Sequence, residues 1–224
     1  MDTVISKQPP VPAAKPAGPS IFKRLKSDVP QDRAEAVAEL SQDPMAKDRR
    51  TAMELIKSVT DRGDRGMPAI RTIMRLTTEP ELGIAALEVL GKIWGTDDWV
   101  GVLGGRFIAM NAWLMVETDS AAIHAANEAV AMFGLEELVQ WRHMCVREIP
   151  DMAPVDEAER KLRMIANQSA HAKVALAALS HMRLYEDTWL YDLRELTRCS
   201  IHPQVREAAQ KKLDELSGPD KGTG

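Results

Sequence analysis

The sequence predicts an all-α protein in which about five helical hairpins stack into a right-handed α-solenoid. Three observations lead to this fold class. Aromatic residues make up only 4% of a chain whose apolar fraction is 45%, and plentiful Ala, Leu, Met and Glu favour helices over sheets. Helical periodicity is nearly continuous over residues 31–217. Two segments, 79–95 and 202–218, are copies of one helical template, and such a unit must stack on others to bury its apolar face.

The expected helices follow one another with turn residues between them. Their ranges are 31–42, 46–60, 66–77, 80–94, 97–117, 120–133, 135–148, 155–167, 169–183, 186–198 and 203–217. Capping side chains, prolines that suit a first turn and glycines that follow apolar runs mark the boundaries. The expected N-caps are Asp97, Ser120 and Ser169, the first-turn prolines are Pro80 and Pro203, and the C-terminal caps are Gly95, Gly134 and Gly218.

The repeat extends beyond the two clear copies, which align without a gap. Pro80 falls on Pro203 and Leu82 falls on Val205, and a pair of small residues follows in each copy. The first residues of such small pairs, including weaker copies, lie at positions 52, 85, 125, 175 and 208. Their mean spacing of about 39 residues is typical of a helical-hairpin repeat. Small side chains at these positions let neighbouring helices approach closely.

The second copy also carries a family pattern. The run His202–Ala209 (HPQVREAA), with Leu213 and Leu216 after it, resembles the second helix of HEAT repeats, whose pattern is Asp-x-x-Val-Arg-x-x-Ala with spaced Leu. His202 stands where that family usually has Asp, and Gly83 in the first copy stands where it usually has Arg. The resemblance covers residues 31–217 and implies an armadillo-like helical solenoid. It implies no particular client, because fold and function are separable.

Three regions are expected: a Pro-rich disordered tail at 1–27, the helical-repeat domain at 28–217 and a loose end at 218–224. Within the tail, residues 21–26 form a short basic, amphipathic segment suited to weak contact with an acidic membrane or a partner groove. The start lacks the apolar core of a secretory signal, and two cysteines are too few for a disulfide scaffold, which predicts a cytoplasmic protein. The apolar run 99–116 contains Arg106 and Asn111, which argue against a transmembrane span.

No catalytic, cofactor or metal site is expected from the sequence. His143 and Cys145 point in different directions on a helix, and the Cys199–His202 spacing has no second pair to complete four-coordination. The chain has no Gly-x-Ser-x-Gly element, and the glycine-rich run 101–106 matches neither a P-loop nor a dinucleotide fingerprint. These observations favour a binding protein over an enzyme.

Two groups of residues are candidates for a partner-binding surface. Tryptophan concentrates contact area at interfaces, and converging arginines can receive an acidic segment or a phosphate backbone. The candidates are Trp94, Trp99, Trp113, Trp141, Arg62, Arg65, Arg71 and Arg75.

We therefore expect a non-catalytic scaffold or adaptor that binds a protein or peptide partner on the concave face of the array. One alternative is a nucleic-acid-binding repeat protein that uses the basic group at 47–75, although the formal net charge of −4 disfavours it. A second alternative is a HEAT-like lyase or a regulatory subunit of an enzyme complex.

Overall fold

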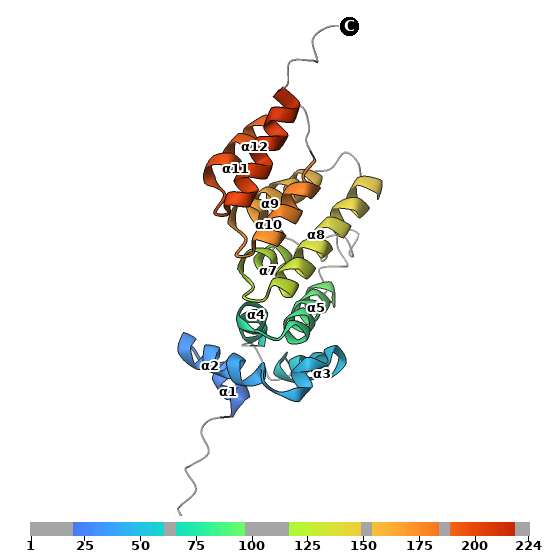
Figure 1. Cartoon of the computed structure of the whole chain (residues 1–224). Coiled ribbons are helices and arrows are strands. Elements are labelled where there is room, and N and C mark those ends of the chain that lie inside the picture. Colours follow the sequence, from blue (N-terminus) through green and yellow to red (C-terminus); the bar gives the residue numbers. More distant parts are fainter. Residues whose placement is uncertain (1–19, 61–65, 97–116, 149–153, 184–188, 218–224) are drawn as a thin grey trace, which may run out of the picture.

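The computed structural model describes residues 20–60, 66–96, 117–148, 154–183 and 189–217, and within these ranges all regular secondary structure is helical. Helices hold 85% of the described residues, and none of these residues forms a strand (Figure 1). The all-α prediction is therefore confirmed. The elements are α1 (Ile21–Leu25), α2 (Pro30–Leu40), the 3-10 helix η1 (Pro44–Lys47), α3 (Arg49–Thr60), α4 (Gly66–Leu76), α5 (Pro80–Thr96), α7 (Asp119–His124), α8 (Glu128–Glu148), α9 (Pro154–Gln168), α10 (Ala172–His181), α11 (Trp189–Cys199) and α12 (Pro203–Ser217).

The helices pack in neighbouring pairs: α4 with α5, α7 with α8, α9 with α10, and α11 with α12. The first helices of these pairs contact one another in the order α4, α7, α9 and α11. Helix α2 contacts α4 in turn, and we call these five helices the first row. The second row is α3, α5, α8, α10 and α12, and its members also contact one another in that order. Figure 1 shows the pairs following one another along a body with α1, α2 and α3 at one end and α11 and α12 at the other.

One continuous apolar cluster runs through this body and includes residues of every α-helix. Helix α4 illustrates the local cause, because Ala69, Ile70, Ile73 and Met74 recur at helical spacing and are fully buried. Helix α5 lies between α3, α4 and α8, and most of its described side chains are buried accordingly. Each fully buried Leu or Ile contributes about 1.5–3 kcal/mol relative to an exposed one.

The third pair differs from the sequence prediction. A helix break was expected at Gly134, but the break lies at residues 125–127 and α8 runs through Gly134 without interruption. The Asn127 side chain caps α8, since its Oδ1 accepts from the N–H of Ala129 at 2.9 Å. Gly134 instead permits close packing, because a Cβ there would lie 2.7 Å from the carbonyl oxygen of Thr118. Gly95 likewise lies inside α5, which continues to Thr96.

The packed body includes residues 21–25, which the sequence analysis placed in the N-terminal tail. They form α1, whose Leu25 is fully buried against the common core. An ion pair between Arg24 and Glu39 also ties α1 to α2. The predictions for 1–19, for residues 97–116 of the helix expected at 97–117, and for 218–224 lie outside the described residues.

Candidate functional site

A three-residue turn joins the two helices of each of the four pairs, a similar turn leads from α2 into η1, and the chemistry of these turns repeats. The five turns begin at residues 41, 77, 125, 169 and 200, and four of them begin with Ser or Thr. In three turns this hydroxyl accepts from the N–H two residues later, at 3.1 Å in Thr77, 3.3 Å in Ser169 and 3.5 Å in Ser200. Such local bonds favour a turn over continued helix, which explains why the first helices end here.

Each of the last three turns is also bonded to the pair before it. The second turn residue donates its N–H to a carbonyl in the last turn of the preceding first helix: Ala126 to Arg75 at 2.8 Å, Ala170 to Ile123 at 3.0 Å, and Ile201 to Asn167 at 3.2 Å. The third turn residue donates its side-chain N–H to a carbonyl of the preceding turn: Asn127 to Thr78 at 2.8 Å, His171 to Ala125 at 2.9 Å, and His202 to Ser169 at 2.8 Å. Successive pairs are therefore held in one register.

Ion pairs between consecutive first helices repeat with the same register, and we call them the ion-pair ladder. Its three rungs are Arg71–Glu117, Asp119–Lys161 and Arg163–Asp192. The first member of each rung lies six residues before its own turn (77, 125 or 169). The second lies eight residues before the next turn (125, 169 or 200). The rungs join α4 to Glu117, two residues before α7 begins, then α7 to α9, and α9 to α11.

The ladder groups are shielded from water to different degrees. Glu117 has a side chain only 1% exposed, and its Oε1 lies 2.6 Å from Nη2 of Arg71, which is 37% exposed. Lys161 is also buried, and its ammonium group meets Asp119. Desolvated charges are costly unless they are paired, so these rungs fix the spacing of neighbouring helices.

A hollow of about 160 Å³ lies on the second row between α5 and α8. Its walls are Glu88, Gly91, Lys92, Phe133 and Glu137, and we call it the second-row pocket. Burial raises the pKa of the Glu137 carboxyl, and the nearby Glu88 carboxylate raises it further.

A cation already lies beside this pocket. The Arg49 guanidinium from α3 stands 5.1 Å from the centre of the Phe133 ring and also binds Glu88. This contact is within the range of a cation–π interaction. The pocket thus combines acidic oxygens with an aromatic ring, an environment suited to a positively charged side chain.

A second hollow, of about 200 Å³, lies between α9, the end of α10 and α11. Its carboxylates are mostly occupied already: Glu159 accepts from Arg142 at 2.9 Å and from the N–H of Arg183 at 3.0 Å, and Asp192 pairs with Arg163. In the second-row pocket Glu88 is likewise paired, with Arg49, but Glu137 has no ion pair among the described residues, so that pocket is the better suited to a cationic ligand.

The predicted arginine group is divided by the structure. Arg71 forms a ladder rung, and Arg75 donates from Nη2 to the Ser120 hydroxyl at 2.9 Å, so both join α4 to α7. Arg62 and Arg65 lie outside the described residues. The structure thus gives Arg71 and Arg75 a role in holding pairs together, and their role in partner binding stays a prediction.

The predicted tryptophans are equally dispersed. Trp141 is 4% exposed within α8, and its indole Nε1 has no hydrogen-bond partner among the described residues. Trp94 lies in the last part of α5, where the side chains are outside the described set, and Trp99 and Trp113 fall beyond it entirely. Of the four, only Trp141 has a described environment, and that environment is the core.

Sequence reasoning did not find the second-row pocket, because its side chains come from different helices. It could have found the turns: the spacing of a hydroxyl residue and a Pro three positions later occurs at 41–44, 77–80 and 200–203. The signal is absent at 125–128, and the third copy was accordingly misplaced: Ala125 begins a turn and does not lie in a second helix.

Within the described ranges, no helix combines the length and apolar character that crossing a membrane requires. Nor do three or more His, Cys, Asp or Glu side chains gather as metal ligands in this part of the chain. Comparisons of the chain with family models, with curated proteins and with solved structures find no match in any of the three. The fold and site define an all-helical protein of stacked helix pairs.

Proposed function

We propose that this chain is a non-catalytic scaffold or adaptor. Its helix pairs form a right-handed α-solenoid of about five HEAT-like hairpins that binds a protein or peptide on its concave face. The observation that supports this most is the ion-pair ladder, which repeats at the same register across three successive junctions. Such an array holds separated side chains in fixed positions, so a receptor of this kind loses little conformational entropy when it binds.

The second-row pocket supplies an anchor point for the partner. A Lys or Arg side chain of the partner would enter beside Glu137 and Glu88 and lie against the Phe133 ring. The raised pKa of Glu137 indicates a carboxylate poorly compensated within this chain, and an incoming cation would compensate it. A partner with a basic residue flanked by apolar ones therefore fits best.

Affinity capture followed by reconstitution tests the proposal. The full chain is immobilised, a recovered protein is purified separately, and its affinity is measured by titration calorimetry against the wild type and Glu88→Gln/Glu137→Gln. We expect at least a ten-fold loss of affinity in the double variant. Glu54→Gln on the exposed side of α3 is the matched control and should bind as the wild type does. Equal affinity of all three proteins would refute the anchor.

A second arm, without residues 1–19, separates the helical body from the Pro-rich N-terminal segment and leaves α1 in place. Retention of nucleic acid alone, with affinity falling steeply as salt rises, would replace the adaptor with the nucleic-acid alternative. That alternative has fewer available charges than the sequence implied. Arg49, Lys57 and Arg71 each pair with a carboxylate of the chain itself.

A further inference from the structure

The ion-pair ladder ends on α11 at an arginine that has no partner in the ladder, and we call this position the open rung. Arg194 lies six residues before the turn at 200, the position that Arg71, Asp119 and Arg163 occupy before theirs. Each of those three binds an opposite charge on the next first helix. Helices α11 and α12 form the last pair within the described residues, and Arg194 has no ion-pair partner among these residues.

The backbone carbonyl that would accept a hydrogen bond from a next turn also lacks that donor at this end. The carbonyls of Arg75, Ile123 and Asn167 each accept an N–H from the next turn, and the Arg198 carbonyl holds the equivalent position. No N–H of the described residues outside the helix reaches it. The Ser200 carbonyl, which a next turn would otherwise bind, instead accepts from Nη1 of Arg206 at 2.6 Å.

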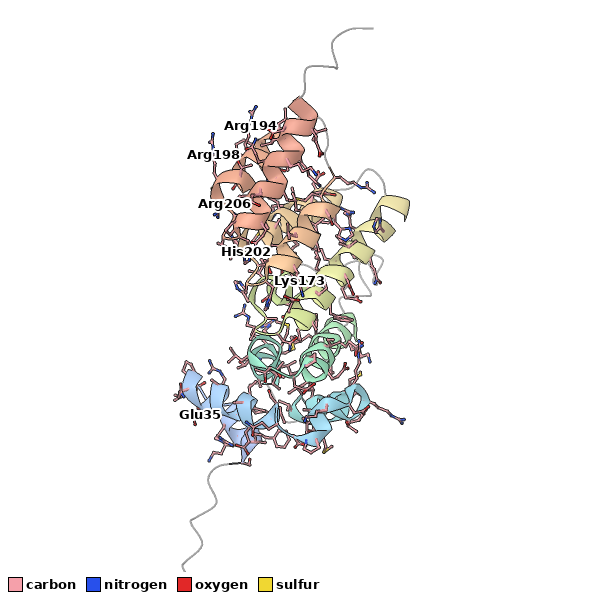
Figure 2. The ribbon with its side chains drawn as sticks, viewed as in Figure 1. Glu35, Lys173, Arg194, Arg198, His202 and Arg206 are labelled. Atoms are coloured by element: carbon pink, nitrogen blue, oxygen red, sulfur yellow. The ribbon has the colours of Figure 1, made fainter. Side chains whose placement is uncertain are left out.

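Apolar side chains flank the open rung. Tyr191 is 68% exposed and Ile201 is 57% exposed, and both rank among the few large apolar side chains left in solvent. Tyr191, Arg194 and Arg198 fall three and four positions apart, which puts them on one face of α11. Figure 2 places the labelled Arg194 and Arg198 on the outer side of the end of the body that α11 and α12 form. We call Tyr191, Arg194, Arg198 and Ile201 the α11 surface.

A polar surface is what the end of a helical-repeat array needs for solubility, and two arginines alone would satisfy that requirement. Exposed Tyr and Ile at the same place do not serve solubility. Tyr and Arg are, by contrast, the residues that carry binding energy at interfaces. The α11 surface therefore has the composition of a contact surface in addition to the register of an unfinished junction.

We propose that an acidic helix of a different protein packs on the α11 surface, where the next first helix would lie. A carboxylate of that helix binds Arg194 as Asp192 binds Arg163, and its apolar side chains cover Tyr191 and Ile201. This surface is distinct from the second-row pocket, so the inference does not depend on the function proposed for that pocket.

Charge argues against a second copy of this chain as the occupant. In a head-to-tail stack, α2 would take the place beside α11, and the residue eight positions before its turn at 41 is Arg33. Helix α1 already packs on α2, and the three carboxylates of α2 are bound within the chain: Asp32 by Ser27, Glu35 by Gln31 and Glu39 by Arg24. In a two-fold contact between two α11 surfaces, Arg194 would face another Arg194. Both arrangements set Arg194 against another arginine at the ladder position, whereas an acidic helix brings a carboxylate there.

The test uses two fluorescein-labelled model helices of 18 residues. Each carries Leu and Ala on its apolar face, with a single Glu in the first peptide and a single Lys at that position in the second. Binding to the full chain is followed by fluorescence anisotropy at physiological salt. We expect the Glu helix to bind at least ten-fold tighter than the Lys helix, and Arg194→Glu to reverse the preference.

Lys211→Glu on α12 is the matched control, since it makes the same charge change on a side chain that is also solvent-exposed. It should leave the preference unchanged. The proposal is overturned if neither helix binds, if both bind equally, or if Lys211→Glu acts as strongly as Arg194→Glu. Sedimentation equilibrium adds a further outcome: self-association of the wild type that Arg194→Glu abolishes would assign the surface to a second copy and overturn the proposal too.

Discussion

Replacing Arg71 with Met isolates the energetic role of the ion-pair ladder. The substitution keeps much of the side-chain volume but leaves the Glu117 carboxylate, which is 1% exposed, without its guanidinium. Breaking a buried pair by removal of one partner costs about 3–5 kcal/mol, whereas an exposed pair contributes about 0–1 kcal/mol. Because Arg71 itself is partly exposed, we expect the lower end, a loss of about 3 kcal/mol in the free energy of unfolding.

Urea unfolding followed by far-UV circular dichroism measures this loss. Lys211→Met is the control, because it breaks an exposed pair with Glu215 and should cost at most about 0.5 kcal/mol. Arg71→Met/Glu117→Gln removes both charges, so most of the stability should return. If Arg71→Met costs no more than Lys211→Met, the buried rung does not stabilise the junction and the reasoning fails.

Three further substitutions test other parts of the structure. Gly134→Ala should destabilise the protein by about 1–3 kcal/mol in thermal melts, since the new Cβ would lie 2.7 Å from a backbone oxygen, and an unchanged or higher melting temperature would contradict the close approach. Ser169→Ala should cost about 1–2 kcal/mol in urea unfolding, because the Ala122 carbonyl loses a buried 2.7 Å bond, and no loss would show that the bond is dispensable. Glu137→Gln should raise stability at neutral pH, since a carboxyl whose pKa is raised by folding disfavours the folded state once ionised. The gain should vanish below about pH 4, and a gain that persists there would exclude ionisation as its cause.

Many helices could be predicted because capping residues, helix-ending residues and the spacing of apolar residues are local properties of the sequence. The expected ranges 66–77 and 203–217 differ from α4 and α12 by at most one residue. The third pair shows where local reasoning fails. A glycine after an apolar run suits a C-terminal cap, but at Gly134 the glycine serves a neighbouring helix, and only tertiary packing distinguishes these cases.

The candidate site was less accessible to sequence reasoning. Arg71 was identified as a basic residue available to a partner, yet its partner in the structure is Glu117, and 46 residues separate the two along the chain. Trp141 was chosen for its size and lies in the core. Charge and bulk are visible in one sequence, but exposure and pairing depend on which helices meet.

The signs of the charges in the ion-pair ladder favour one order of assembly of the helix pairs. The preceding helix supplies a positive group at Arg71, a negative one at Asp119 and a positive one at Arg163. If the chain skipped the pair α7–α8 while folding, Arg71 would meet Lys161, and if it skipped α9–α10, Asp119 would meet Asp192. Omission of either pair thus sets like charges against each other, so the alternation of charge discriminates against misassembly of the helix pairs.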